Sequence, residues 1–222
     1  MKVVCWDMDG VLIDSLGLDL KVINPMLREK YGEVEEINRE FIRERFALAI
    51  PEFCRDILKE IDRYTPEDLE WMVKEYELLR RQATYDLCPG VTALLEGIKA
   101  EGFPQWVISN NKEADIDVIL KRVGIREYFD NVWGYDSNPA ISKKPAPDIY
   151  LGAFKAAMAQ YEGIQEFFVF EDSQMGIESA VGARSLWNGV PVRVFGVGTG
   201  GDSMEMLNEA DEVFETLKNF NF

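Results

Sequence analysis

Two acidic side chains follow a short apolar segment near the start of the chain. Val3–Trp6 is apolar, Asp7 and Asp9 stand one residue apart, and Gly10 comes next. This pattern is typical of a buried strand that ends in a turn, and open α/β sheets bind ligands at the carboxyl ends of their strands. Carboxylates at such a position can bind a hard metal ion or transfer protons. Acidic residues also begin turns and cap helices, so this pattern alone leaves both interpretations open.

Two later apolar segments also end in polar side chains. The first stops at Ser109 and Asn110, the second stops at Glu171 and Asp172, and Lys144 lies between them, followed by two prolines that stiffen its loop. The carboxyl ends of parallel strands share one edge of a doubly wound sheet, so these distant residues are expected to converge there. Each group also has an ordinary explanation, as a surface lysine or as a helix cap.

Together these side chains suit phosphoryl transfer through a hard metal ion. Carboxylates at strand ends form an oxygen-rich site for Mg²⁺, which usually binds one or two carboxylates, water and a substrate phosphate. A carboxylate can also attack phosphorus and carry an aspartyl-phosphate intermediate. A lysine and a hydroxyl group would then hold the remaining phosphoryl oxygens and offset the charge that builds on them.

Composition excludes several other classes of protein. The chain has 222 residues, 40 acidic against 24 basic, and a net charge of −16, which argues against a nucleic-acid partner. It has no signal-peptide pattern and no run of about 18 apolar residues, so no membrane partner is expected. Histidine is absent, which removes Ser-His-Asp and Cys-His catalysis and histidine-bound zinc. Cys5, Cys54 and Cys88 are widely spaced, so we predict reduced thiols and a cytoplasmic location.

The elements that must position these groups fall into two regions. Residues 16–85 are nearly all helical in pattern, and Pro25 is expected to kink or divide the first helix. From Cys88 onward, strands alternate with helices, which predicts a parallel sheet with helices on both faces. We therefore predict an α/β fold, with residues 1–15 and 86–222 forming a doubly wound, Rossmann-like catalytic core. Residues 16–85 would form a helical-bundle cap domain inserted after the first strand.

Four motifs in this order resemble those of the haloacid dehalogenase superfamily phosphatases that carry a helical (C1) cap. The motifs are Asp7–Ser15, Ser109–Asn111, Lys144–Pro147 and Glu171–Ile177. The resemblance covers essentially the whole chain, and it is strongest to the branch that contains β-phosphoglucomutase and phosphoglycolate phosphatase. It implies an α/β core that performs the chemistry and a cap that closes over it and selects the substrate.

The resemblance also implies a role for each motif residue. Asp7 would be the nucleophile, and Asp9 would be the general acid and base. Asp9 would protonate the leaving oxygen and then activate the water that hydrolyses the phospho-aspartate. Ser109 and the backbone near Asn110 would bind the phosphoryl group, and Lys144 would bridge that group to Asp7.

The implied metal ion is Mg²⁺. Asp172 would bind it together with the Asp7 carboxylate and the Asp9 main-chain carbonyl, and Glu171 would be a further ligand or would lie just behind the ligands. The expected activity is Mg²⁺-dependent hydrolysis of a small phosphorylated metabolite, a phosphomonoester, through an aspartyl-phosphate. The protein is expected to be a monomer or a weak homo-oligomer.

Three alternatives stay open at this point. A hexose-phosphate mutase would return the phosphoryl group to a bound sugar, although no histidine is present to assist proton transfer as in some relatives of that kind. A catalytically silent binding module is a second alternative, which intact Asp7, Asp9, Lys144 and Asp172 argue against. Residues 196–201 also fit the dinucleotide-binding pattern G-x-G-x-x-G, but the segment that follows is too short for the required helix. We interpret these residues as a flexible loop at the rim of the active site.

Overall fold

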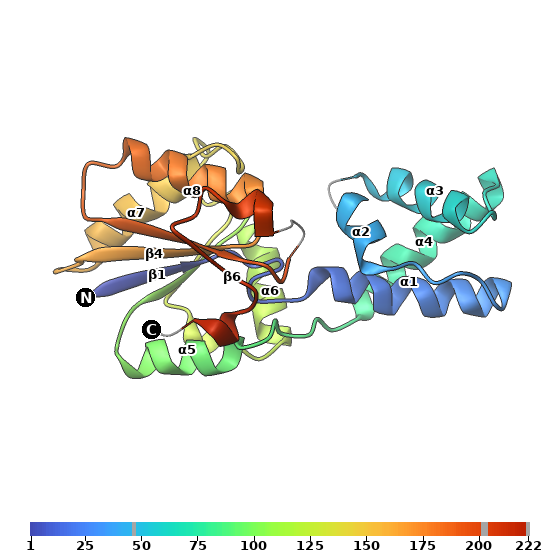
Figure 1. The fold of residues 1–222 in the computed structure, drawn as a ribbon, viewed down its shortest axis with the longest axis horizontal. Helices are drawn as coiled ribbons and strands as arrows, with labels where there is room; N and C mark the ends of the chain where they lie inside the picture. Colours follow the sequence, from blue (N-terminus) through green and yellow to red (C-terminus); the bar gives the residue numbers. More distant parts are fainter. Residues whose placement is uncertain (46–47, 201–203, 221–222) are drawn as a thin grey trace. The chain divides into compact units, whose positions relative to one another are not determined.

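The chain forms two compact units, which are described separately. The computed structural model describes residues 1–45, 48–200 and 204–220. Unit 1 comprises Met1–Asp14 with Leu87–Phe222, and unit 2 comprises Ser15–Asp86 (Figure 1). Within the described residues, none of the helices combines the length and the apolar content needed to cross a lipid bilayer.

Unit 1 is built on a six-stranded sheet in which each pair of neighbours is parallel. The spatial order is β3-β2-β1-β4-β5-β6, which confirms the predicted doubly wound sheet. The direction of winding reverses between β1 and β4, and such a switch point is where open α/β sheets bind ligands. The strands are β1 Lys2–Trp6, β2 Gln105–Ile108, β3 Asn131–Trp133, β4 Glu166–Glu171, β5 Val192–Val197 and β6 Glu212–Phe214.

Helices cover both faces of this sheet. Figure 1 shows α7 and α8 on one face and α5 on the other. The central strands therefore have buried residues on both faces, which explains their continuous apolar sequences. The helices of unit 1 are α5 Val91–Ala100, α6 Glu113–Arg122, α7 Asp148–Gln160 and α8 Gln174–Leu186, with short 3-10 helices η1 Arg126–Tyr128, η2 Met204–Leu207 and η3 Leu217–Asn219.

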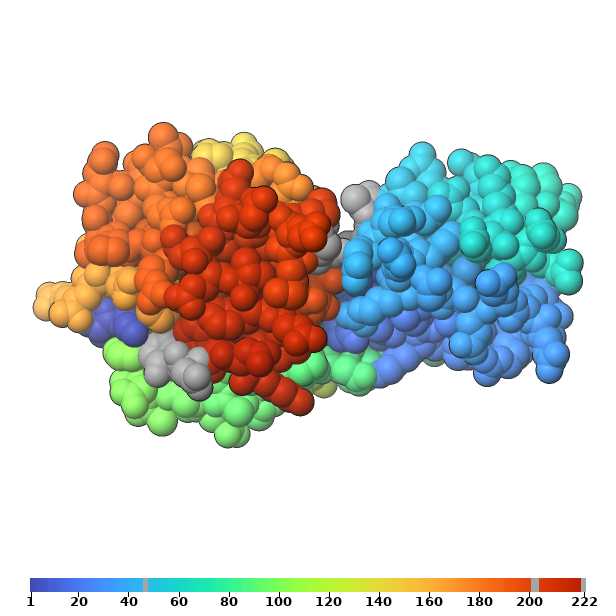
Figure 2. Space-filling view, in the orientation of Figure 1, coloured from blue at the N-terminus to red at the C-terminus, as the bar shows by residue number. Residues whose placement is uncertain are grey.

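The segment from β5 onward covers part of the surface of unit 1 (Figure 2). Near its end the ring of Phe220 packs edge-on against Phe170 and Phe195, with centroid distances of 5.0 Å in both cases. It also meets Phe214 at 5.4 Å. Edge-to-face aromatic pairs of this kind stabilise beyond the area that they bury, so these contacts hold Phe220 against the aromatic residues of β4, β5 and β6.

In its described residues, unit 2 is a bundle of four helices with its own apolar core. The amphipathic pattern puts residues such as Ile23, Phe53 and Met72 inside it. The last helix has a side-chain N-cap, since Thr65 Oγ1 accepts a hydrogen bond from the Asp68 backbone N–H at 3.0 Å. The helices are α1 Ser15–Tyr31, α2 Arg39–Arg45, α3 Ile50–Glu60 and α4 Pro66–Gln82.

Pro25 does not divide the first helix. Helix α1 runs without interruption from Ser15 to Tyr31 and contains this proline. Ile23 and Met26 on either side of it are buried in the core of unit 2. Packing of this apolar stripe outweighs the loss of one backbone hydrogen bond, because most helical stability in proteins comes from tertiary contacts.

Candidate active site

The polar residues at the strand ends gather at the switch point of the sheet. The backbone N–H of Asp7 donates to the Phe170 carbonyl at 2.9 Å, so the chain leaving β1 stays beside the end of β4. The Ser109 N–H donates to the Trp133 carbonyl at 3.0 Å and keeps the end of β2 in the same edge of the sheet. Backbone pairing thus continues past the strands and holds the motif residues in register.

Lys144 lies at the centre of a buried ionic cluster. Its ammonium group donates to Asp7 Oδ1 at 2.5 Å, to Glu171 Oε1 at 2.7 Å and to the Ile108 carbonyl at 2.8 Å. All three ammonium protons therefore have acceptors. Lys144 is 6% exposed, Asp7 is 8% exposed and Glu171 is 1% exposed. One cation therefore faces two carboxylates with little solvent between them. When both carboxyl groups are ionised, such a cluster carries excess negative charge that a further cation would neutralise.

Burial is the main influence on the protonation of Asp7. It raises the pKa of Asp7 to about 8; the Lys144 ammonium opposes this shift, and the Glu171 and Asp9 carboxylates add to it. Burial also disfavours the charge on Lys144, but Asp7 and Glu171 outweigh that effect and raise its pKa. Lys144 is therefore charged at neutral pH. The Asp7 carboxyl would ionise more easily beside a divalent cation.

The shifted pKa predicts how stability depends on pH in the presence of a chelator. Between the ordinary pKa of 3.8 and the folded value of about 8, folded Asp7 binds a proton that the unfolded chain has lost. The free energy of unfolding should therefore fall as the pH rises through this range. Asp7→Asn should reduce this slope, whereas Asp130→Asn at the opposite edge of the sheet should not. Urea unfolding at pH 5 and pH 8 measures the slope, and an equal slope in Asp7→Asn would contradict the assignment.

Three carboxylates form a group that suits a hard divalent cation. Asp7, Glu171 and Asp172 are all buried, and one oxygen from each lies within 4.8 Å of the others. Glu171 Oε1 accepts hydrogen bonds from Lys144 and from the Tyr150 hydroxyl. In the part of the chain that the structure describes, Glu171 Oε2 is buried and has no hydrogen-bond partner. A buried carboxylate oxygen without a donor needs a cation or a water molecule, so this donor set fits Mg²⁺.

Glycines leave room for these carboxylates. A Cβ atom on Gly10 or Gly200 would lie 2.0 Å or 1.5 Å from Asp172 Oδ2, and one on Gly176 would lie 1.9 Å from Glu171 Oε2. Gly10 also has a φ of +78°, a conformation that favours glycine. The absence of side chains at these positions allows the backbone to approach the acidic group closely.

Substitution of Gly176 should test this close approach. A helical Gly→Ala change normally stabilises by about 0.5–1 kcal/mol, and Gly182→Ala in the same helix should do so because its Cβ would meet only Pro147 at 3.5 Å. Gly176→Ala should instead destabilise by about 1–3 kcal/mol through overpacking against Glu171. It should also reduce the thermal stabilisation by Mg²⁺. Differential scanning calorimetry with Mg²⁺ or chelator measures both effects, and equal behaviour of the two variants would contradict the geometry.

The loop after β5 also reaches this site. Thr199 Oγ1 donates to the Gly10 carbonyl at 2.6 Å, and Gly200 lies against Asp172. Of the segment interpreted from the sequence as a rim loop, Gly201 lies outside the described residues, whereas residues up to Gly200 are described. These contacts place Thr199 and Gly200 beside the acidic group, in agreement with the interpretation of a loop at the rim of the site. Gly196 and Val197 are instead the last residues of β5.

Asn110 uses its side chain to hold Lys144. Its Oδ1 accepts the Lys144 backbone N–H at 2.8 Å, and its Nδ2 donates to the Lys144 carbonyl at 3.2 Å. Both polar ends of the amide are therefore engaged with the lysine loop. A contribution of Asn110 to phosphoryl binding would come from its backbone.

Two further residues, to which the sequence analysis assigned no role, bond to residues of the site. Asn111 Nδ2 donates to Asp9 Oδ2 at 2.7 Å, and the fully buried Tyr150 donates to Glu171. Asn111 had a signal in the sequence, since it extends the polar run at the end of β2. Tyr150 had none, because one aromatic residue in the first turn of a helix is most often part of the core.

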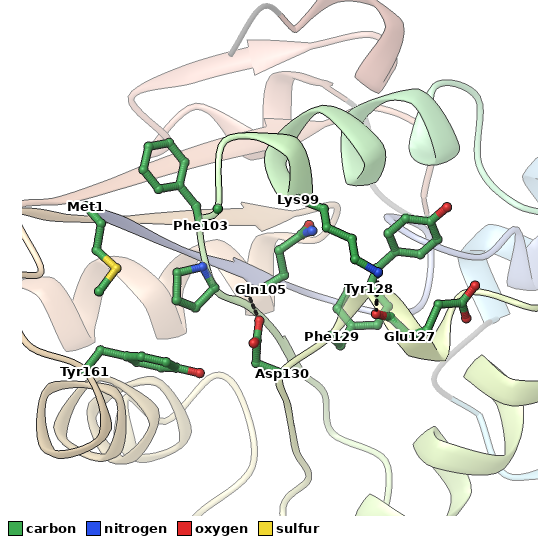
Figure 3. Close-up of a pocket in the computed structure, with 11 residues that line it drawn as sticks. Met1, Lys99, Phe103, Gln105, Glu127, Tyr128, Phe129, Asp130 and Tyr161 are labelled. Atoms are coloured by element: carbon green, nitrogen blue, oxygen red, sulfur yellow. Dashed lines mark hydrogen bonds between the residues drawn. The ribbon is translucent and has the colours of Figure 1, made fainter.

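A cavity at the amino ends of the strands is distinct from this site. It measures about 380 Å³ and lies at the amino end of β2, where Phe103 and Tyr161 line it (Figure 3). Its polar groups bond to one another: the Gln105 N–H donates to Asp130 Oδ2 at 2.9 Å, and Lys99 Nζ donates to the Glu127 carbonyl at 3.1 Å. None of the motif residues lines this cavity.

Comparison with known proteins identifies the family. A model described as haloacid dehalogenase-like hydrolase matches residues 1–184. The chain belongs to the haloacid dehalogenase-like hydrolases. This family membership agrees with the four motifs and with the sheet that carries them.

Curated relatives of this haloacid dehalogenase-like hydrolase include phosphoglycolate phosphatases. The protein from Aquifex aeolicus is 29% identical over 148 residues, which cover 66% of this chain and 66% of that protein. The match therefore spans just under two thirds of the Aquifex protein. The protein from Neisseria meningitidis serogroup A is 27% identical over 217 residues, covering 95% of this chain and 86% of that one.

Solved structures share the fold over nearly the whole chain. A haloacid dehalogenase family hydrolase from Deinococcus radiodurans, solved with bound phosphate and sodium, is 21% identical with a TM-score of 0.74, covering 97% of this chain and 91% of that one. A β-phosphoglucomutase from Clostridium difficile is also 21% identical, with a TM-score of 0.61, covering 99% and 93% of the two chains. At this level of identity the similarity shows the fold alone.

Proposed function

We propose that the protein is a Mg²⁺-dependent phosphomonoester hydrolase that forms an aspartyl-phosphate on Asp7. The observation that carries the proposal is the buried cluster of Asp7, Lys144 and Glu171, beside Asp172 and with one orphan carboxylate oxygen. A cluster in which one ammonium group faces several buried carboxylates is expensive to maintain for stability alone. It suits a site that must hold a cation and an anionic substrate.

In the first proposed step the Asp7 carboxylate attacks the phosphorus atom of the substrate. A bond forms between the carboxylate oxygen and phosphorus, and the bond from phosphorus to the leaving oxygen breaks. Asp9 gives its proton to that oxygen, so the product leaves as a neutral alcohol. Lys144 and the Ser109 hydroxyl stabilise the phosphoryl oxygens, where negative charge is concentrated.

In the second proposed step a water molecule displaces Asp7 from the phosphorus atom. Asp9, now ionised, accepts a proton from water as the water oxygen attacks phosphorus, and the bond between phosphorus and Asp7 breaks. Inorganic phosphate leaves, the Asp7 carboxylate is restored and Asp9 is protonated again. One carboxyl group thus serves as acid and then as base, which balances protons over the cycle.

The residues that would hold Mg²⁺ are Asp7, Asp172, the Asp9 main-chain carbonyl and Glu171. When bound there, the ion supplies positive charge against the substrate phosphate and brings it to Asp7. Glu171 is well placed for this task because Lys144 and Tyr150 occupy one of its oxygens and leave the other without a donor. We further propose that unit 2, residues 15–86, is a cap domain that selects the leaving group.

The first substrate to test is 2-phosphoglycolate, because two curated relatives carry the name phosphoglycolate phosphatase. Phosphate release would be measured for 2-phosphoglycolate, glycerol 3-phosphate, hexose phosphates and nucleotides, with Mg²⁺ and with chelator. We expect Mg²⁺-dependent release of phosphate from a small phosphorylated acid or alcohol, at a higher kcat/KM than from nucleotides. Conversion of one hexose phosphate isomer into another without net release would instead establish a mutase, and no turnover of any phosphate ester would contradict the proposal.

A further inference from the structure

Asn111 bonds to both Asp9 and Ser109, which have different roles in the proposed mechanism: Asp9 transfers protons and Ser109 binds the phosphoryl group. Its Nδ2 donates to Asp9 Oδ2 at 2.7 Å and to Ser109 Oγ at 3.2 Å, so the two amide protons have separate acceptors. Its backbone N–H also donates to Ser109 Oγ at 3.2 Å. The Asn111 carbonyl in turn accepts the Tyr135 N–H at 3.2 Å, which fixes the backbone from the other side.

These contacts determine where the Ser109 proton can go. A serine hydroxyl has one proton to donate and two positions at which it accepts. Asn111 occupies both accepting positions, one with its backbone and one with its side chain. Ser109 is 2% exposed, and its hydroxyl donates to no acceptor among the residues that the structure describes. The proton is therefore left for an acceptor that a substrate brings, such as a phosphoryl oxygen.

The same amide also fixes Asp9. Its N–H is bound to one carboxylate oxygen, so the carboxyl group cannot rotate freely about its last bond. While Asp9 is ionised, a reversed amide would place the Asn111 carbonyl oxygen against its carboxylate, where two acceptors repel each other. In that state the Asn111 amide has one favourable orientation, and that orientation serves Asp9 and Ser109 together.

We propose that Asn111 is a positioning residue that orients the proton donor Asp9 and the phosphoryl-binding hydroxyl of Ser109. This inference rests on the proposed hydrolase function. Without the amide, Asp9 can turn away from the leaving oxygen, and the Ser109 hydroxyl can turn toward its own backbone. Loss of Asp9 positioning slows the first step, and therefore lowers kcat/KM, for substrates whose leaving group needs a proton. Its effect on the second step, the attack of water, is the same for every substrate and appears in kcat. Loss of Ser109 positioning weakens phosphate binding for every substrate.

The test compares two substrates that differ in the acidity of the leaving group. With 4-nitrophenyl phosphate the leaving group is stable as an anion, whereas an alkyl phosphate such as glycerol 3-phosphate must have its leaving oxygen protonated. Asn111→Ala is expected to lower kcat/KM by about tenfold or more for the alkyl phosphate beyond its effect on the aryl phosphate. The inhibition constant for inorganic phosphate should rise as well. Asn131→Ala, which removes an amide bonded only to the backbone of β3, is the matched control and should leave both substrates unaffected.

A second variant guards against misfolding of the first. Asn111→Asp keeps the shape of the side chain and removes both Nδ2 donors, so it should show the same difference between alkyl and aryl substrates. The inference is overturned by equal losses on the two substrates in the folded variants, or by an unchanged inhibition constant for phosphate. If the wild-type enzyme hydrolyses neither ester, the proposed function fails instead, which keeps the two failures distinct.

Discussion

Asp7→Asn is expected to reduce kcat to the background rate, a loss of about four orders of magnitude or more, with the fold retained. The amide of asparagine cannot form the bond to phosphorus, and Asp7 is the carboxylate after β1 that accepts from the Lys144 ammonium group. The variant should still fold, because burial already favours the neutral form of Asp7. Phosphate release in the presence of Mg²⁺ measures the loss of turnover.

Asp130→Asn is the matched control for this substitution. Asp130 also accepts a hydrogen bond, from the Gln105 N–H at 2.9 Å, but it lies at the amino ends of the strands, away from Asp7. The Asp130→Asn variant should have the same kcat as the wild-type enzyme. If Asp7→Asn retains turnover that a chelator abolishes, another residue must be the nucleophile and the mechanism proposed here is wrong.

Lys144→Met is expected to impair both stability and catalysis. The ammonium group compensates the negative charge of two buried carboxylates. The side chain of Asp7 is 11% exposed and that of Glu171 is 1% exposed. Its removal at pH 8 leaves buried charge unpaired, which destabilises by about 3–5 kcal/mol. At pH 5 the destabilisation should be smaller, because Asp7 can bind a proton. In the presence of Mg²⁺, kcat should fall by about 10²–10³-fold through loss of the positive charge that stabilises the phosphoryl oxygens.

The neighbouring lysine offers a control for Lys144→Met. Lys143 is exposed, and its ammonium group lies 4.1 Å from the centre of the Tyr135 ring. Lys143→Met should change the free energy of unfolding by less than about 0.5 kcal/mol and leave kcat unchanged. Chemical unfolding measures the free energy of unfolding of the two variants, and steady-state kinetics measures their kcat. Equal effects of the two substitutions would show that Lys144 has no special place in the site.

The sequence predicted the sheet and its motif residues for a physical reason. Strands that are buried on both faces must be apolar throughout, so the polar residues at their ends stand out. Asp7, Ser109 and Glu171 were found in this way, and the topology then brings them to one edge. Lys144 required the proline pattern of its loop as a second signal. The roles of these residues in catalysis stay predictions until they are measured.

Other features depend on contacts that a linear sequence does not display. The continuity of α1 through Pro25 follows from packing on both sides of the proline. Tyr150 bonds to Glu171 from a helix in which an aromatic residue is ordinarily part of the core. Gly176 is needed only because the Glu171 carboxylate lies where its Cβ would be. Each of these depends on the three-dimensional approach of segments that are far apart in the chain or on local packing.

The most direct test of the account is to locate the covalent intermediate. The enzyme would be quenched in acid during turnover with Mg²⁺ and substrate, reduced with borohydride and digested for mass spectrometry. Reduction converts an aspartyl-phosphate into homoserine, so we predict homoserine at position 7 and unmodified aspartate at position 9. Homoserine at another position, or none during active turnover in a quench fast enough to trap the intermediate, would contradict the proposal that Asp7 carries the phosphoryl group.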